Sequence, residues 1–230
     1  MAGNDSNHFG ITISILFAKV LTEKMPNISL NTSYLSTALT HLLRDKELAP
    51  LLKKVGRITI NQKHPPSPLH SLAESITSQQ LNGRAATAIF GRLLDLFNGR
   101  LTADKILTTP QDKLRSVGLS AAKTTAIYDL AEKTKSKVVP GWATLQKMDD
   151  EAIVQRLTQV RGIGRWTVEM LLIFSLGRTD IWPVDDFAIK KAYGLHFGIA
   201  EPKPAEMKAR AESWRPWRSV VARYLWESLE

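Results

Sequence analysis

The stretch VRGIGRWTVEM, residues 160–170, interrupts one helical pattern and starts another within a few residues. The segment before it, MDDEAIVQRLTQV, has its apolar residues at the spacing of an amphipathic helix, and the segment after it is strongly apolar up to Gly177. Gly162 and Gly164 allow backbone conformations with positive φ, so the chain can turn tightly between the two segments. The stretch therefore predicts a helix–hairpin–helix unit whose turn amides can hold an anion. For this motif alone, a packing corner between two helices is the alternative.

Helical spacing of apolar residues continues through most of the chain, whereas strand signals are nearly absent. A second helix–turn–helix pattern, LRSVGLSAAKTTAIYDLA, lies around Gly118. Only Arg57–Asn61 alternates in a way that favours an extended segment. The fold class predicted from these patterns is all-α. Helices are expected at about residues 69–77 and 81–96, after Pro110, from Ala121, at 148–160, up to Gly177, and after Pro216.

Composition restricts the classes of function. The 230 residues carry 31 Lys and Arg against 22 Asp and Glu, and the resulting formal charge of +9 suits a polyanionic partner such as nucleic acid. Cysteine is absent, which excludes disulfides, thiolate metal sites and cysteine nucleophiles. The apolar run Phe9–Ala18 is too short to span a membrane, so an intracellular protein without a membrane partner is expected.

The segment Pro183–Phe187, PVDDF, follows the apolar helix and places two aspartates at a helix entrance. Together with ITSQQLNGRAA, GIGRWTVEM and SWRPWRSVVARYLW, it resembles the helix–hairpin–helix (HhH-GPD) superfamily of DNA glycosylases, and within it the 3-methyladenine DNA glycosylase II branch. The resemblance runs from about Leu69 to the C-terminus. It implies a compact form that lacks the N-terminal β domain of some members.

This resemblance implies a two-lobed helical fold with a DNA cleft between the lobes. One lobe is expected to be continuous over residues 69–177, and the other to combine residues 26–68 with 178–230. Residues 1–25 are expected to be a loosely ordered extension of the glycosylase domain.

The resemblance also implies roles for single residues. Asp186 corresponds to the catalytic aspartate, although a helix cap is the alternative for either aspartate of the pair. Trp166, Trp226 and Asp185 are expected at the base pocket, where an indole can stack on a positively charged alkylated base; core packing is the alternative for both tryptophans. Trp166 takes the place of the lysine that strand-cleaving members use, so a monofunctional enzyme is implied.

Two further groups of residues are assigned through the resemblance. The carbonyls of Thr158, Val160 and Ile163 match positions that hold a monovalent cation in relatives, so a structural sodium or potassium ion is the only cofactor considered. The residues expected to contact DNA are Gly162, Gly164, Arg165 and Thr167 of the main hairpin, Gln79, Gln80 and Asn82 of the turn that fills the gap left by a flipped base, and Gly118 and Lys123 of the first hairpin.

The implied activity is hydrolysis of the N-glycosidic bond of alkylated bases, of the 3-methyladenine or 7-methylguanine type, in double-stranded DNA. The protein is expected to act as a monomer in the nucleus or, in a bacterium, in the cytoplasm. The alternative is a helix–hairpin–helix protein that binds damaged or abasic DNA without chemistry. A helical protein unrelated to DNA is the third possibility, and it requires that all the motifs are accidental.

Overall fold

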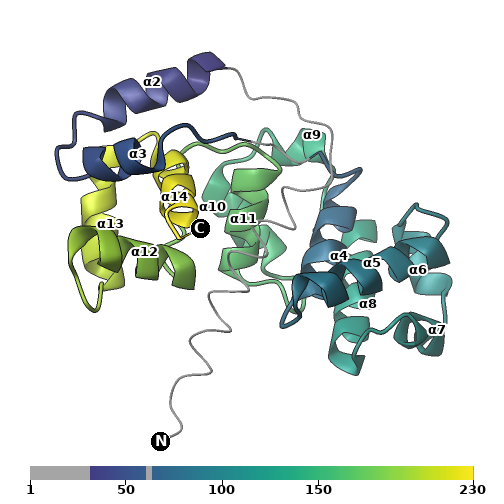
Figure 1. The fold of residues 1–230 in the computed structure, drawn as a ribbon. Helices are drawn as coiled ribbons and strands as arrows, with labels where there is room; N and C mark the ends of the chain where they lie inside the picture. The colour runs from purple at the N-terminus through teal and green to yellow at the C-terminus, as the bar shows by residue number, and fades with distance from the viewer. Residues whose placement is uncertain (1–31, 61–63, 230) are drawn as a thin grey trace, which may run out of the picture. The chain divides into compact units, whose positions relative to one another are not determined.

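The computed structural model describes residues 32–60 and 64–229, and every regular element in these two ranges is a helix (Figure 1). The all-α prediction is therefore confirmed for the described part of the chain. The extension expected over residues 1–25 lies outside the described residues. The described residues divide into two compact units, one formed by residues 64–171 and the other by residues 32–60 together with 172–229.

The unit of residues 64–171 is organised around α8 (Ala121–Lys135), which packs against α4, α6 and α7, while α4 also packs against α5. Leu72, Ile76, Ile127 and Leu130 from α4 and α8 are fully buried, so the apolar faces of these two helices form much of its core. The other helices of the unit are α4 (Pro68–Ser78), α5 (Gly83–Leu96), α6 (Ala103–Thr108), α7 (Gln111–Ser116), α9 (Trp142–Leu145), α10 (Asp150–Leu157) and the first part of α11 (Arg165–Phe174).

Polar side chains cap the N-termini of five of these helices. Each accepts a hydrogen bond from a backbone N–H of the first turn, which satisfies a donor that the helix itself leaves unpaired. The capping residues are Ser67 for α4, Asn82 for α5, Thr102 for α6, Ser120 for α8 and Asp149 for α10.

The other unit combines the described N-terminal helices with the C-terminal part of the chain. Its α14 (Arg218–Glu227) packs against α12 (Phe187–Phe197) and α3 (Ala49–Val55). Trp214 is completely buried, and its indole Nε1 donates a hydrogen bond of 2.8 Å to Asp45, which joins the two segments of sequence. The remaining elements are α2 (Thr32–Leu42), the end of α11, α13 (Pro204–Ala211) and a short 3₁₀ helix, η1 (Glu212–Trp214).

One boundary between the units lies inside α11, after Leu171, and the other separates the two described ranges, 32–60 and 64–229. Residues 57–60, which were expected to be extended, have no regular secondary structure, but Ile58 and Ile60 are buried. Within the described residues, no helix has the length and apolar character needed to cross a membrane.

Candidate functional site

Asp186 is a buried carboxylate at the start of a helix. It is the N-cap of α12, and its Oδ1 accepts a hydrogen bond of 2.8 Å from the Ile189 N–H. The same oxygen accepts a second hydrogen bond of 3.1 Å from Nε1 of Trp226 in α14. Only 2% of Asp186 is exposed. The helix N-terminus and the indole therefore fix the carboxylate in one orientation.

Asp185, its neighbour, has a different environment. Its side chain is 66% exposed, and its carboxylate lies 3.7 Å from the ammonium group of Lys190. Of the two aspartates, Asp186 alone caps the helix, and Asp185 forms a surface ion pair of the kind that contributes little to stability. The structure thus distinguishes two residues that are equivalent by type in the sequence.

Trp226 is held by a layer of side chains that sequence reasoning missed. Its indole stacks on the ring of Phe174, with the ring centroids 5.7 Å apart. The buried guanidinium of Arg223, one helical turn before Trp226, lies 4.6 Å from the Phe174 ring centroid and donates a hydrogen bond to the Ile173 carbonyl. Burial lowers the pKa of Arg223 to about 10, so this guanidinium is charged at neutral pH. The sequence pattern RYLW, residues 223–226, does not indicate that Arg223 is buried.

The main hairpin follows the expected plan. Gly162 has φ of 80°, whereas Gly164 has no positive φ, so only the first glycine needs the left-handed conformation. Both glycines are exposed, and neither of their N–H groups donates to a protein acceptor in the part of the chain that the structure describes. The Arg161 N–H does have an acceptor, Oδ2 of Asp129 in α8, at 2.6 Å. The turn therefore presents two amides at the start of α11.

The residues that open α11 differ in exposure. Arg165 is exposed and forms a bidentate ion pair with Glu151, with nitrogen–oxygen distances of 2.6 and 3.0 Å. Trp166 is partly exposed on the first helical turn, as the sequence predicts. Thr167, however, is only 5% exposed, so most of this residue is covered by the protein, and its contact with DNA stays a prediction.

The turn between α4 and α5 places its three polar residues in three different environments. Asn82 caps α5 by accepting a hydrogen bond from the Ala85 N–H. Nε2 of Gln79 donates a hydrogen bond of 2.7 Å to the carbonyl of Gly162. Gln80 is exposed and has a left-handed φ of 56°. Of the three, Gln80 alone presents a side chain that makes no hydrogen bond within the described part of the protein.

The first hairpin is tied to its neighbours through side chains. Gly118 has φ of 106°, which L side chains rarely adopt, and a Cβ there would lie 3.0 Å from Nη2 of Arg92, so any other residue would be strained. Lys123 lies at the start of the next helix, but its ammonium group donates to the carbonyls of Thr77 and Gln79, both at 2.7 Å. Two of its three donors are therefore used inside the protein, which was not expected of a DNA-contacting lysine.

Comparison with known proteins places this arrangement in a family. Residues 73–219 match the model of the HhH-GPD superfamily base excision DNA repair proteins. The chain belongs to the HhH-GPD superfamily. It is 37% identical over 188 residues to DNA-3-methyladenine glycosylase 1 of Schizosaccharomyces pombe, an alignment that covers 80% of this chain and 82% of the relative.

Two solved structures of the superfamily resemble the chain over most of their lengths. One is the 3-methyladenine DNA glycosylase of Schizosaccharomyces pombe in complex with abasic DNA, with a TM-score of 0.74, 36% identity, and coverage of 84% of this chain and 96% of that one. The other is a DNA-3-methyladenine glycosidase of Bacillus halodurans, with a TM-score of 0.75, 28% identity, and coverage of 89% and 92%. The helical HhH-GPD fold predicted from the motifs is thus confirmed.

The carbonyls assigned to a monovalent cation come from the end of α10 and the hairpin turn of this HhH-GPD chain. The carbonyl of Val160 accepts a hydrogen bond of 3.0 Å from the Ile163 N–H, so one of its two lone pairs is used. Thr158 follows directly after the last residue of α10. Carbonyl oxygens suit a hard cation, so the residues fit such an ion, and its presence stays a prediction.

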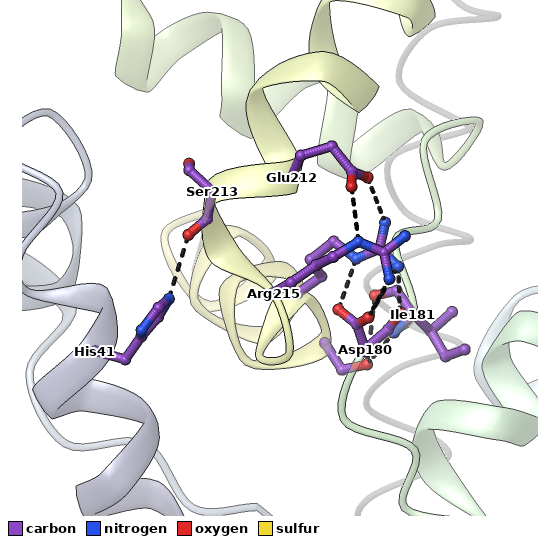
Figure 2. A network of polar contacts seen from close by, with 8 residues as sticks. His41, Asp180, Ile181, Glu212, Ser213 and Arg215 are labelled. Atoms are coloured by element: carbon purple, nitrogen blue, oxygen red, sulfur yellow. Dashed lines mark hydrogen bonds and ion pairs between the residues drawn. The ribbon is translucent and has the colours of Figure 1, made fainter.

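The arginines of the SWRPWRS motif are held in an ion-pair network rather than presented freely. Figure 2 shows Arg215 between Asp180 and Glu212, at 2.7 and 2.8 Å. Arg218 also pairs with both carboxylates, at 2.7 and 3.2 Å. This network links the start of α14 to the segment that leads into Asp186. The motif therefore stabilises the backbone that positions Asp186.

Proposed function

We propose that this chain is a base-excision-repair DNA glycosylase that hydrolyses the N-glycosidic bond of alkylated bases in double-stranded DNA and leaves an abasic site. The buried Asp186 carboxylate, oriented by the N-terminus of α12 and by Trp226, is the observation that carries the proposal. The names of its relatives, which are 3-methyladenine DNA glycosylases, support the choice of alkylated bases as substrate.

Asp186 would act on the sugar. As the bond between base and C1′ breaks, positive charge develops on the sugar ring, and a fixed carboxylate stabilises that charge without having to reorganise. The same carboxylate can accept a proton from the water that attacks C1′. Oδ1 of Asp186 accepts hydrogen bonds from the Ile189 N–H and from Nε1 of Trp226, and these hold the group in place for this task.

Water is the nucleophile that the residues favour. Strand cleavage by this type of enzyme needs an amine that forms a Schiff base with the sugar, and α11 contains no lysine from Arg165 to Phe174. Trp166 on its first turn offers an aromatic face instead, which can stack on a cationic base. The reaction therefore stops at the abasic site.

The main hairpin and the Gln79–Asn82 turn would bind the DNA. The exposed amides of Gly162 and Gly164 lie next to the positive end of α11, and Arg165 can exchange its exposed partner Glu151 for a phosphate. Gln80, the exposed residue at the tip of the other turn, would fill the space left by the flipped base. A monovalent cation on the hairpin carbonyls would add positive charge beside the same phosphate.

The test is release of methylated base from methylated duplex DNA by the wild type and by Asp186→Asn and Asp185→Asn. Asparagine caps a helix as well as aspartate and can accept from Trp226, so Asp186→Asn removes the charge while it keeps the fold. We expect base release to fall by about a hundredfold or more in this variant, with DNA binding retained. Asp185→Asn, the matched control, is expected to act like the wild type because its side chain is exposed.

The alternative, a DNA-binding protein without chemistry, makes the opposite prediction. It requires that the wild type releases no base although it binds abasic DNA tightly and in a salt-dependent way. Equal loss of activity in both aspartate variants would instead contradict the assignment of Asp186 alone.

A further inference from the structure

One side of α8 contacts two separate turns of the unit formed by residues 64–171. Lys123, Ala126 and Asp129 are spaced three residues apart, so they lie along one face of this helix. Lys123 donates to the carbonyls of Thr77 and Gln79 at the end of α4, and Asp129 accepts from the Arg161 N–H in the main hairpin. The helix therefore works as a rigid spacer between the α4–α5 turn and the hairpin.

Between these two contacts, the main hairpin packs directly against α8. A Cβ atom on Gly162 would lie 3.6 Å from the Cβ of Ala126, so the hairpin backbone approaches α8 directly at this point. The side chain of Gln79 then joins the two turns without the helix, through its hydrogen bond of 2.7 Å to the Gly162 carbonyl. Each turn is thus fixed relative to the other by side chains that come from distant parts of the sequence.

The position of Lys123 also has an electrostatic reason. Its ammonium group lies at the C-terminal end of α4 (Pro68–Ser78), where unpaired carbonyls and the helix dipole favour a positive charge. Burial lowers the pKa of Lys123. A lysine placed there mainly to attract phosphate would be solvated, whereas this one caps the end of a helix.

Gln80 is the residue that these contacts leave exposed. Its neighbour Gln79 is held by hydrogen bonds at both its carbonyl and its side-chain amide. Gln80 itself has a left-handed φ that only few non-glycine residues adopt. Such a conformation persists only where the surroundings impose it.

We propose that Lys123 and Gln79 are positioning residues that hold the Gln80 turn at a fixed distance from the main hairpin. Gln80 is then placed to enter the duplex when the main hairpin binds the DNA backbone. This proposal rests on the proposed glycosylase function. It assigns to Lys123 and Gln79 a role in flipping the nucleotide, through Gln80, rather than direct contact with DNA or with the reacting sugar.

The experiment compares two duplexes that differ only in the cost of flipping. One contains 7-methylguanine paired with cytosine, and the other has the same lesion opposite a tetrahydrofuran abasic analogue, which leaves no base pair to break. Single-turnover base release is measured for the wild type, Lys123→Met and Gln79→Leu. We expect both variants to lose about tenfold in rate on the paired lesion and to stay within about twofold of the wild type on the unpaired one.

Matched controls come from the same unit. Lys135→Met changes a 64% exposed lysine at the end of α8, and Gln159→Leu changes an exposed glutamine near the hairpin. Both are expected to match the wild type on both duplexes. Thermal melting of each variant identifies one that does not fold, and Gln79→Leu tests the proposal independently of Lys123→Met.

The outcomes separate this proposal from the proposed function. An equal loss on both duplexes, or no loss on either, overturns the positioning role, because neither result depends on breaking a base pair. If the wild type releases no base from either duplex, the glycosylase function itself fails.

Discussion

Trp226 and Trp182 are buried tryptophans of the same unit that differ in what the indole nitrogen contacts. Nε1 of Trp226 donates to Asp186, whereas Nε1 of Trp182 is buried and has no hydrogen-bond partner among the described residues. A hydrogen bond to a charged group contributes about 1.5–3 kcal/mol. We therefore predict that Trp226→Phe lowers kcat for base release by about tenfold or more, while its ring still stacks on Phe174.

Trp182→Phe is the matched control for this prediction. It removes the same atoms from a buried site but breaks no hydrogen bond, so kcat is expected to stay within about twofold of the wild type. Single-turnover kinetics at saturating DNA separate kcat from binding. A similar loss of kcat in both variants would show that packing, and not the donor to Asp186, explains the effect.

The hairpin offers a comparison at the scale of an element. Gly162 has φ of 80°, and an alanine there has the cost of a left-handed conformation, about 1–2 kcal/mol, although its Cβ would meet only Ala126 at an ordinary distance. Gly164 has no positive φ, and no heavy atom lies within 4 Å of the place that an added methyl group would occupy. We predict that Gly162→Ala lowers the melting temperature by several degrees and that Gly164→Ala leaves it unchanged.

DNA binding gives the second half of this test. A methyl group at position 164 would cover the exposed amide where a phosphate is expected, so Gly164→Ala should weaken DNA binding without any change in stability. Melting curves and binding to abasic duplex at fixed salt measure the two effects. Tight binding by Gly164→Ala would mean that phosphate does not approach this amide.

The sequence predicts the elements better than the contacts between them. Helix periodicity, glycine turns and a capping aspartate are local patterns, so the α10–α11 hairpin and the cap of α12 by one of the PVDDF aspartates follow from neighbouring residues. The hydrogen bond from Gln79 to Gly162 joins positions 83 residues apart, and Lys123 reaches carbonyls 44 and 46 residues away. A local sequence pattern does not indicate contacts between such distant positions. Gln79 and Lys123 were therefore both predicted to contact DNA.

At the scale of the whole molecule, one unit depends on a carboxylate that joins the two ends of the sequence. Asp45 follows α2, and it accepts hydrogen bonds from the Leu48 and Glu47 N–H groups and from the buried indole of Trp214, while Arg210 lies 3.3 Å away. Burial alone raises the pKa of Asp45, but these hydrogen bonds and the guanidinium outweigh it, and the net pKa lies below its ordinary value.

The lowered pKa of Asp45 determines how the stability of the fold changes with pH. Because the pKa of Asp45 is lower in the folded state, its contribution to stability is fully present above about pH 5, near and above the unfolded pKa, and is lost as the pH falls through the folded value. We predict that Asp45→Asn lowers the melting temperature at pH 7 and that the difference from the wild type shrinks below about pH 4. Asp104→Asn, whose side chain is 77% exposed, is the control and should follow the wild type at each pH. A difference between Asp45→Asn and the wild type that stays constant from about pH 7 to about pH 3 would assign the effect to shape rather than charge.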